Sequence, residues 1–346
     1  MPQVDKYEAT HLRNIKALEK RIRQVYEDAL TTIAFRASLY PFASEQFSLS
    51  KYPLLKSQIE EIIKKLHGEL YSNIVAGIDA SWSLSAMKND AFVDRRLAGL
   101  QPSQQARSIL YDPNVNALNR FKARRRNGLN LSDRVWKTMK PFRKEVEQGL
   151  GLMVGEGMPA AEMATTLKKY LYEPDRLFRR VRSEEGVLKL SRAAQEYHPG
   201  QGVYRSSYKN SLRLTRTETN ISYRSADYER WQKIPFIVGI QIRLSNAHKI
   251  YDICDDLQGK YPRDFKFVGW HPQCICNAVP IQMTNEEFFR YQDEILESGA
   301  IKSSSVNEVV KTPAGFDDYV QKNGDRIKGW KNTPYWVKDN KEYVKL

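Results

Sequence analysis

Five side chains that can bind a transition metal lie within residues 246–281, which read NAHKIYDICDDLQGKYPRDFKFVGWHPQCICNAVPI. They are His248, Cys254, His271, Cys274 and Cys276, and they include all three cysteines and two of the five histidines of the chain. Thiolate and imidazole are ligands that zinc prefers, and a structural zinc site uses four donors in a tetrahedron. If residues 274–281 form a strand, the sulfurs of Cys274 and Cys276 project from the same face. These residues predict a closed, structural metal site, with zinc as the expected ion.

The same residues are compatible with three other interpretations. The Cys and His side chains can pack without a ligand in a small β core. Cys254 can form a disulfide with one of the later cysteines, although three cysteines cannot all pair and no secretory signal indicates an oxidising compartment. Cys254 and His271 can form a nucleophile dyad, although no third group that would orient the histidine is identified. The zinc deaminase signature, His-x-Glu with Pro-Cys-x-x-Cys, does not occur in the sequence.

The spacing around the cluster resembles a known family. Asp252, Cys254, Leu257 and Gly259 form a turn of the type D-x-C-x-x-L-x-G, and H-P-x-C-x-C follows it before an apolar segment. This pattern is similar to the C-terminal signature of the Mu F-like phage head morphogenesis family, the minor head proteins of tailed phages. Residues 214–220, LTRTETN, resemble the R-T-E helix that precedes the signature in that family, with Arg216, Thr217 and Glu218 at the motif positions. The resemblance extends over residues 131–281 and is dense only from 213 onward.

Two positions depart from the family pattern. Many members have C-x-x-C before the L-x-G, and Tyr251 stands at the first of those positions in this chain. Many also have Arg between the last two cysteines, where this chain has Ile275. The first departure favours His248 as the substitute ligand.

The resemblance implies a function in a virus particle. It predicts a minor head protein of a phage or prophage that acts in capsid morphogenesis near the portal and lies in the virion head. Portal and capsid proteins, together with packaged double-stranded DNA, are the implied partners. Two other classes stay open. One is an enzyme that uses the Cys/His site or is related to phage-head-linked toxins, although we identify no catalytic constellation. The other is a zinc-stabilised, non-specific DNA-binding protein unrelated to virions.

Charge supports a polyanionic partner. The chain has 55 Lys and Arg against 41 Asp and Glu, a formal net charge of +14. An excess of this kind favours non-specific attraction to nucleic acid. Two basic runs are candidate DNA contacts, and no motif that reads base edges accompanies them. The first run is Lys122, Arg124, Arg125 and Arg126, and the second is Arg176, Arg179, Arg180 and Arg182. A solvated loop or helix face is the simpler interpretation of each run.

The sequence does not predict a membrane protein. Its mean hydropathy is −0.60, and no apolar run approaches the roughly 18 residues that span a bilayer. The first residues are charged and have no apolar core of a signal peptide, so we expect synthesis in the cytoplasm of the host.

The apolar pattern predicts a mostly α protein with a small C-terminal α+β module. Long helices are expected to residue 40 and over 54–87, with apolar stripes that either pack on each other or dock on a partner. A single helix should follow an N-cap at Ser132 and continue to Met153, another should span 206–231, and a strand should follow Pro235. On the helix 206–231, Arg216, Asn220, Tyr223 and Asp227 share one face that either binds a partner or packs beside the β module. We divide the chain into a helical assembly module (1–90), an irregular basic linker or arm (91–130), the head morphogenesis domain (131–281) and a helical C-terminal extension (282–346). We expect residues 131–346 to fold alone.

Overall fold

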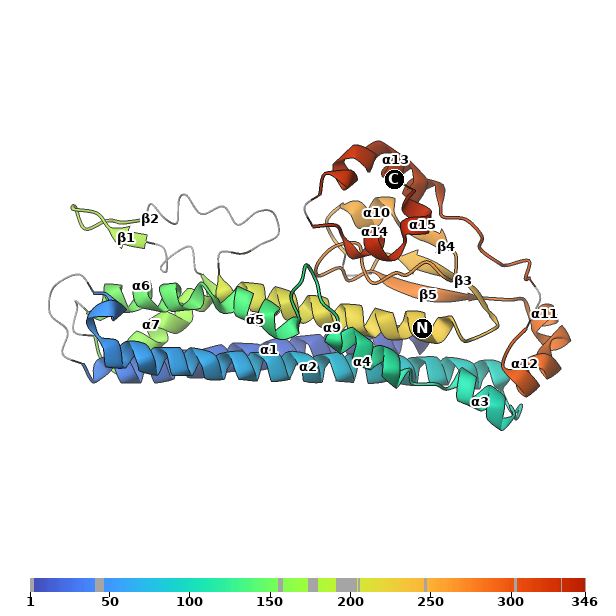
Figure 1. Ribbon diagram of the computed structural model, residues 1–346, viewed down its shortest axis with the longest axis horizontal. Coiled ribbons are helices and arrows are strands. Elements are labelled where there is room, and N and C mark those ends of the chain that lie inside the picture. The colour runs from blue at the N-terminus through green and yellow to red at the C-terminus, as the bar shows by residue number, and fades with distance from the viewer. Residues whose placement is uncertain are drawn as a thin grey trace. The chain divides into compact units, whose positions relative to one another are not determined.

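The computed structural model describes residues 3–40, 47–154, 158–173, 180–190, 204, 206–245, 248–301, 304–330 and 332–345. The chain forms two compact units. The sheet unit contains Met1–Asn14, Gly77–Asn127 and Arg216–Leu346, and the helical unit contains Ile15–Ala76 and Gly128–Thr215. Three long helices contribute residues to both units: α1 (Gln3–Ser38), α2 (Pro53–Leu97) and α9 (Ser207–Trp231) (Figure 1). None of the described helices combines the length and the apolar character needed to cross a membrane.

The helical unit adds several shorter elements to its parts of the long helices. These are the 3-10 turn η1 (Leu49–Lys51), α5 (Leu131–Met139), α6 (Phe142–Val154), α7 (Ala160–Tyr172) and a hairpin of β1 (Arg180–Arg182) and β2 (Leu188–Leu190). Apolar residues at intervals of three and four give each long helix a face that is buried on folding. Ile22 and Ile33 of α1 and Ile59 and Leu70 of α2 are fully buried in this way. The apolar stripe of α1 therefore packs inside the protein.

The sheet unit contains the three-stranded sheet and most of the short helices. Before α9 it has α3 (Gln104–Leu110) and α4 (Val115–Ala123); after α9 it has β3 (Ile237–Arg243), α10 (Ile253–Asp256), β4 (Gly259–Tyr261), β5 (Asn277–Gln282), α11 (Asn285–Arg290), α12 (Gln292–Ser298), α13 (Ala314–Lys328), α14 (Tyr335–Asp339) and α15 (Lys341–Val344). The strand order is β4-β3-β5, and both pairs are antiparallel. Ile240 and Ile242 of β3 are buried, so the central strand supplies the core of this unit. The predicted mostly α fold with a small α+β module is confirmed.

The C-terminal tail packs on the sheet unit. Trp336 of α14 is fully buried, and its ring meets those of Trp270 and Phe316 edge to face with centroids 5.9 Å apart. The side chain of Asn340 accepts a hydrogen bond from the backbone N–H of Lys266 at 2.6 Å and donates to the carbonyl of the same residue at 3.1 Å. Aromatic burial and this paired backbone contact fix the tail beside residues 265–270.

The segment 91–130 is not an irregular linker. Helix α2 continues to Leu97, and α3 and α4 follow it. The hydroxyl of Ser103 caps α3 by accepting a hydrogen bond from Ala106 N at 3.1 Å. Each of the two short helices buries a pair of residues four positions apart, Ala106 with Leu110 and Ala117 with Phe121. So few apolar residues among polar ones give a weak helical pattern, which explains why the sequence prediction was wrong.

Two further sequence predictions are corrected in the helical unit. Residues 132–153 form two helices rather than one, because α5 ends at Met139 and α6 begins after Pro141, which has no N–H for an intrahelical hydrogen bond. The N-cap is Asn130, which forms a capping box with Asp133 in place of the expected cap at Ser132.

The two units combine segments from distant parts of the sequence, whereas the sequence analysis divided the chain into consecutive segments. Each unit takes residues from both sides of position 130. A fragment of residues 131–346 would therefore lack part of each core, and its independent folding is not expected from this structure.

Candidate metal centre

The metal-binding candidates come from two loops and one short helix of the sheet unit. His248 follows β3, Cys254 lies in the first turn of α10, and His271, Cys274 and Cys276 precede β5. Because β5 begins at Asn277, the two later cysteines belong to a loop, and the expected strand 274–281 is corrected at its start. Asp252 caps α10 by accepting a hydrogen bond from Cys254 N at 2.7 Å, which fixes the position of this cysteine.

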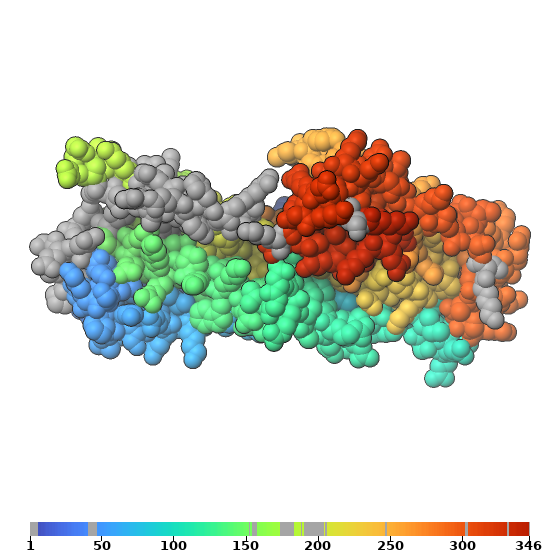
Figure 2. All heavy atoms as spheres, turned by 45° about the horizontal axis from the view of Figure 1, so that its top comes forward, coloured from blue at the N-terminus to red at the C-terminus, as the bar shows by residue number. Residues whose placement is uncertain are grey.

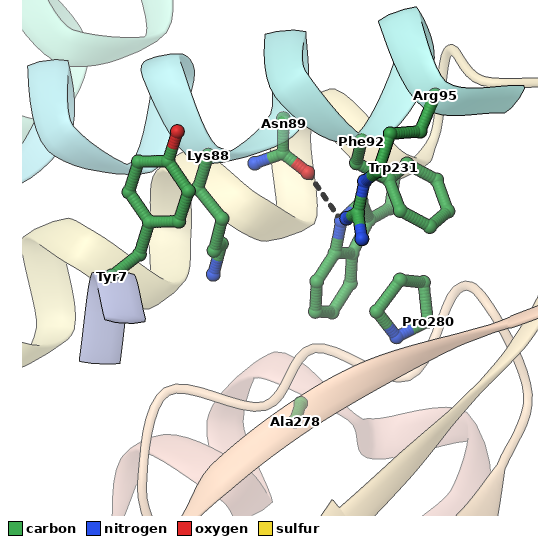
Figure 3. Close-up of a pocket in the computed structure, with 8 residues that line it drawn as sticks. All are labelled: Tyr7, Lys88, Asn89, Phe92, Arg95, Trp231, Ala278 and Pro280. Carbon is green, nitrogen blue, oxygen red and sulfur yellow. Dashed lines mark hydrogen bonds between the residues drawn. The ribbon is translucent and has the colours of Figure 1, made fainter. Parts of the chain in front are cut away.

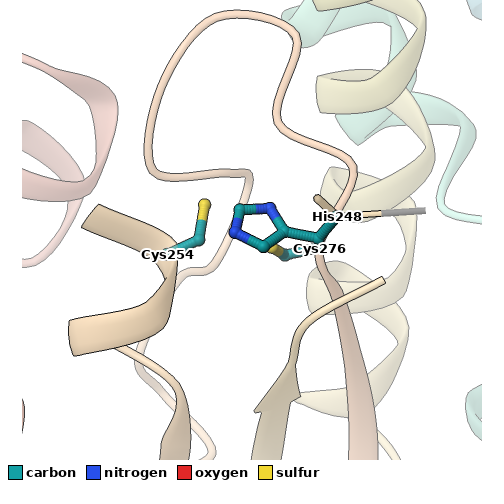
Figure 4. Close-up of side chains that lie close together, drawn as sticks. All are labelled: His248, Cys254 and Cys276. Carbon is teal, nitrogen blue, oxygen red and sulfur yellow. The ribbon is translucent and has the colours of Figure 1, made fainter. Parts of the chain in front are cut away.

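The five side chains converge in the structure. Cys254 Sγ lies 3.7 Å from Cys274 Sγ and 3.2 Å from His271 Nε2. His248, Cys254 and Cys276 point toward one another (Figure 4), with one ligand atom from each within 4.8 Å of the others. A zinc–sulfur bond of about 2.3 Å gives tetrahedral edges of about 3.8 Å between sulfurs, so the observed separations match a metal site. The Cys and His groups of this cluster could therefore hold a metal ion.

No disulfide joins the cysteines, all three of which the structure describes and buries. The distance of 3.7 Å between Cys254 Sγ and Cys274 Sγ is far above the length of about 2.05 Å of an S–S bond. The disulfide alternative thus finds no support in this geometry.

Both histidines have the outer partners that orient a metal ligand. His271 Nδ1 lies 2.8 Å from the carbonyl oxygen of Pro272, so donation from Nδ1 leaves Nε2 as the atom that faces Cys254. His248 Nε2 lies 2.9 Å from a carboxylate oxygen of Asp255, and this hydrogen bond raises the pKa of His248. Metal-bound histidines usually donate their second ring N–H to a carbonyl or carboxylate in this way. Asp255 was not among the predicted site residues, because nothing in the sequence marks it as a partner of His248.

The three thiols change one another's pKa values through their mutual hydrogen bonds. Hydrogen bonds from Cys254 and Cys276 hold the pKa of Cys274 well below its usual value, and the charges of Arg224 and His271 act in the same direction. The hydrogen bond with Cys254 lowers the pKa of Cys276, but the hydrogen bond with Cys274, burial and the charge of Cys274 together outweigh it and raise this pKa to about 12. The same contacts with Cys274 and Cys276 raise the pKa of Cys254. A thiol whose pKa is lowered loses its proton more easily, which suits it to bind a cation, because metal ligands must be deprotonated.

The geometry does not favour a Cys254–His271 nucleophile. The contact of 3.2 Å is short enough for proton transfer, and the carbonyl of Pro272 holds the other ring nitrogen, but in a triad a carboxylate usually takes that place and stabilises the charged imidazole. Asp252 Oδ2 instead lies 3.3 Å from Nε2, the same nitrogen that faces the thiol. The thiol is buried and its pKa is raised, whereas a reactive cysteine is accessible and has a lowered pKa.

Helix α9 holds the cysteine loop in place. Arg216 donates a hydrogen bond to Gln273 Oε1 at 3.2 Å, and Asn220 Nδ2 donates to the carbonyl of Cys274 at 3.3 Å. The guanidinium of Arg224 lies 5.6 Å from the centre of the Phe267 ring. These three residues recur every four positions, so they share one face of the helix. The face containing Arg216 and Asn220 thus packs beside the β module, as one of the two sequence interpretations predicted.

Asp227, further along α9, belongs to a buried polar network between α2 and α9. Asp227 is 3% exposed and accepts hydrogen bonds from Lys88 Nζ at 2.5 Å, Ser85 Oγ at 2.7 Å and Asn89 Nδ2 at 2.8 Å. Asn89 in turn accepts a hydrogen bond from Trp231 Nε1 at 2.7 Å (Figure 3). Because these groups satisfy one another, the network is an interior feature that fixes the two helices.

The first basic run is engaged within the protein. Lys122 Nζ lies 2.9 Å from a carboxylate oxygen of Asp79, and Arg124 Nη2 lies 2.7 Å from the fully buried carboxylate of Glu218. Arg126 stacks on the ring of Tyr335, with its Cζ 3.5 Å from the ring centre, and Arg125 is exposed. Of the second run, Arg176 and Arg179 lie outside the described residues, while Arg180 and Arg182 form the ends of β1.

The R-T-E motif occupies the part of α9 that belongs to the sheet unit. Arg216 contacts the cysteine loop, Glu218 contacts Arg124, and Thr217 is buried. Comparisons of the chain with protein-family models, with curated proteins and with solved structures find no match.

Proposed function

We propose that this chain is a minor head protein of a phage or prophage, acting in capsid morphogenesis near the portal. Its Cys/His cluster would hold a structural zinc ion, its helical unit would contact portal or capsid proteins, and its basic surface would contact packaged DNA without sequence preference. The location in the virion head and these partners follow from the resemblance and are part of the proposal.

One observation carries the proposal. The two sequence blocks that resemble the head morphogenesis family lie far apart in the sequence, yet Arg216 and Asn220 of the first block bond directly to Gln273 and Cys274 of the second. A chance likeness at two separate places would give no reason for their side chains to meet. Their contact supports the interpretation that both belong to one inherited structural element.

Zinc is the ion that the donor set favours. Three thiolates with one imidazole form a Cys₃His site, a common closed arrangement for structural zinc. Cys254, Cys274 and Cys276 supply the sulfurs, and His271 or His248 supplies the nitrogen. Bound there, zinc would stabilise the fold by joining α10 to the loop before β5, and no step of catalysis is required of it.

Co-purification of the full chain with the portal protein encoded by the same phage or prophage tests the assignment. Phe35 of α1 is 54% exposed and lies in the helical unit, so it is a candidate docking residue. We expect Phe35→Ser to weaken capture by the portal. Phe289→Ser removes a side chain that is 70% exposed in the sheet unit and should leave capture unchanged. Failure of the unaltered chain to bind the portal, or to join heads, would contradict the proposal.

The contact between Cys254 and His271 is the one observation that favours an enzyme. If this thiol is a nucleophile, a thiol-selective electrophile should modify Cys254 faster than Cys276 in the metal-free protein, and His271→Ala should slow that reaction. Equal and slow modification of the two thiols, or protection of both by zinc, would support the metal site instead.

A further inference from the structure

A cationic cleft lies in the sheet unit, apart from the Cys/His cluster. It has a volume of about 180 Å³ and is lined by five cationic side chains and one carboxylate, that of Asp339. The cations are Arg124, Arg125, Arg126, Lys266 and Lys338. This volume is below the range of about 300–1,000 Å³ that is typical of sites for whole organic ligands, so the cleft suits a small anionic group.

Three separate segments bring these charges together. The arginines follow α4, Lys266 lies between β4 and β5, and Lys338 belongs to α14. The C-terminal helices lie against the segment after α4 (Figure 2), where Asn127 Nδ2 donates a hydrogen bond to Asn332 Oδ1 at 2.5 Å. The cleft is thus produced by the fold, and only its arginine side is visible as a run in the sequence.

Aromatic rings hold the cations in position. The Cζ of Arg124 lies 3.4 Å from the centre of the Phe121 ring, and that of Arg126 lies 3.5 Å from the centre of the Tyr335 ring. Lys266 Nζ lies 5.3 Å from the centre of the Tyr228 ring. A guanidinium that stacks on a ring directs its N–H donors along the plane of the group, where they match the oxygens of a phosphate.

Positive charge exceeds negative charge in the cleft. Among the described residues that line the cleft, five cations lie beside one carboxylate, that of Asp339, and Arg124 pairs with a second, that of Glu218. Counted over these seven residues, the cleft has an excess of three positive charges. Like charges held this close repel one another, so an anion that enters the cleft is stabilised by all of them.

We propose that this cleft binds phosphate groups, and that the backbone of duplex DNA supplies them. The phosphate chemistry follows from the residues of the cleft, whereas the choice of DNA as its source rests on the proposed function. The cleft differs from the first basic run of the sequence. Lys122, which pairs with Asp79, lies outside the cleft, whereas Lys266 and Lys338 line it together with the three arginines.

Two double variants of the full chain test this proposal. Lys266→Gln with Lys338→Gln removes two charges from the cleft. Lys260→Gln with Lys322→Gln removes the same charge from two exposed lysines of the same unit outside the cleft. Each lost phosphate contact flattens the dependence of log affinity on log salt by about 0.9 for duplex DNA, so the cleft variant should lose about 2 from the slope. The control variant should keep the slope of the unaltered protein.

If the two double variants lose the same amount of salt slope, the cleft is not a specific phosphate site, and DNA is attracted only by the overall positive charge. Thermal unfolding of all variants verifies that they are folded, and Lys338→Gln alone, at an exposed position, gives a second measurement. Inorganic phosphate, compared with acetate at equal ionic strength, separates the two sources of phosphate. One outcome is that phosphate stabilises the unaltered protein but not the Lys266→Gln, Lys338→Gln variant, while both bind duplex DNA with the same affinity and salt slope. That result would show that the cleft binds phosphate but that DNA is not its source. Capture by the portal is measured independently, so failure of the cleft and failure of the head assignment are distinguishable.

Discussion

Replacement of Asp227 by Asn should destabilise the sheet unit strongly. The carboxylate is almost fully buried and accepts three hydrogen bonds, one of them from the ammonium group of Lys88. Removing one partner of a buried ion pair costs about 3–5 kcal/mol, because the remaining charge stays buried without compensation. Glu8 Oε1 lies 3.8 Å from Lys88 Nζ and would offset part of this cost. We therefore expect a loss at the low end, about 3 kcal/mol.

Urea unfolding of the full chain measures this loss. Lys122→Met is the matched control, since Lys122 pairs with Asp79 in the same unit but keeps 31% of its side chain exposed. Pairs that remain exposed to water contribute about 0.2–1 kcal/mol, so the control should lose at most about 1 kcal/mol. Combining Asp227→Asn with Lys88→Met should cost less than the sum of the two single changes, because no charge is then left unpaired.

Two results would contradict a buried, interacting Lys88–Asp227 pair. Asp227→Asn could cost no more than the Lys122→Met control, which would mean that water reaches Lys88 in the folded protein. Alternatively, the double variant could show strict additivity, which would mean that Lys88 and Asp227 do not interact energetically. Either outcome would also remove the argument that this network fixes α2 to α9.

Three further predictions concern the cluster and its surroundings. Protein purified without chelator should contain about one zinc per chain, and a strong chelator should lower its melting temperature; unchanged melting and no bound zinc would leave the packed, unliganded core. Burial lowers the pKa of His11 from 6.5 to about 4, so the neutral ring is the form that the fold stabilises. Stability should therefore be complete above pH 6.5 and fall by up to about 3 kcal/mol as pH drops to 4, a dependence that His11→Gln should reduce. Gly269 has φ +116°, and a Cβ at this position would lie 3.2 Å from the Cβ of Cys274, so Gly269→Ala should weaken zinc binding. Gly99 is the control, because it has φ +86° but open space around it. Gly99→Ala should lower the free energy of unfolding by about 1–3 kcal/mol and leave zinc binding unchanged.

The convergence of the candidate metal donors could be predicted from the sequence because most of them are close in the chain. His271, Cys274 and Cys276 lie within six residues, and any compact turn brings them together. The contribution of Cys254 depended on the fold, but its position in a short, capped helix restricts where it can lie. The outer partners of the histidines were not predictable, because the carbonyl of Pro272 and the carboxylate of Asp255 bear no mark of this role in the sequence.

The helices and the central strand followed the apolar pattern, and local polar chemistry set their ends. Pro141 divides a helix whose apolar spacing continues across it, and Asn130 is a cap only because Asp133 completes the box. The composition of the two units could not be predicted at all. Each unit takes parts of the same three long helices, and apolar periodicity does not indicate which part of a long helix packs with which partner.

The basic run shows why charge clusters in a sequence are hard to interpret. Lys122 and Arg124 differ by two positions, yet one pairs with Asp79 and the other with the buried Glu218. The sequence contains the charged residues but does not show which of them pair. A solvated basic face and a basic binding site therefore look alike until the fold is known. In the cleft, Lys266 and Lys338 lie with the three arginines although they are far from them in the sequence.

The R-T-E motif acquires a physical meaning from its spacing on α9. Residues two positions apart on a helix point about 200° away from each other, so Arg216 and Glu218 necessarily face different neighbours. Arg216 reaches the cysteine loop through Gln273, and Glu218 reaches the cationic cleft through Arg124. One helix therefore orders the candidate metal centre on one side and the candidate phosphate site on the other. Because the contacts are on opposite faces, loss of either side chain should disturb one site and leave the other intact.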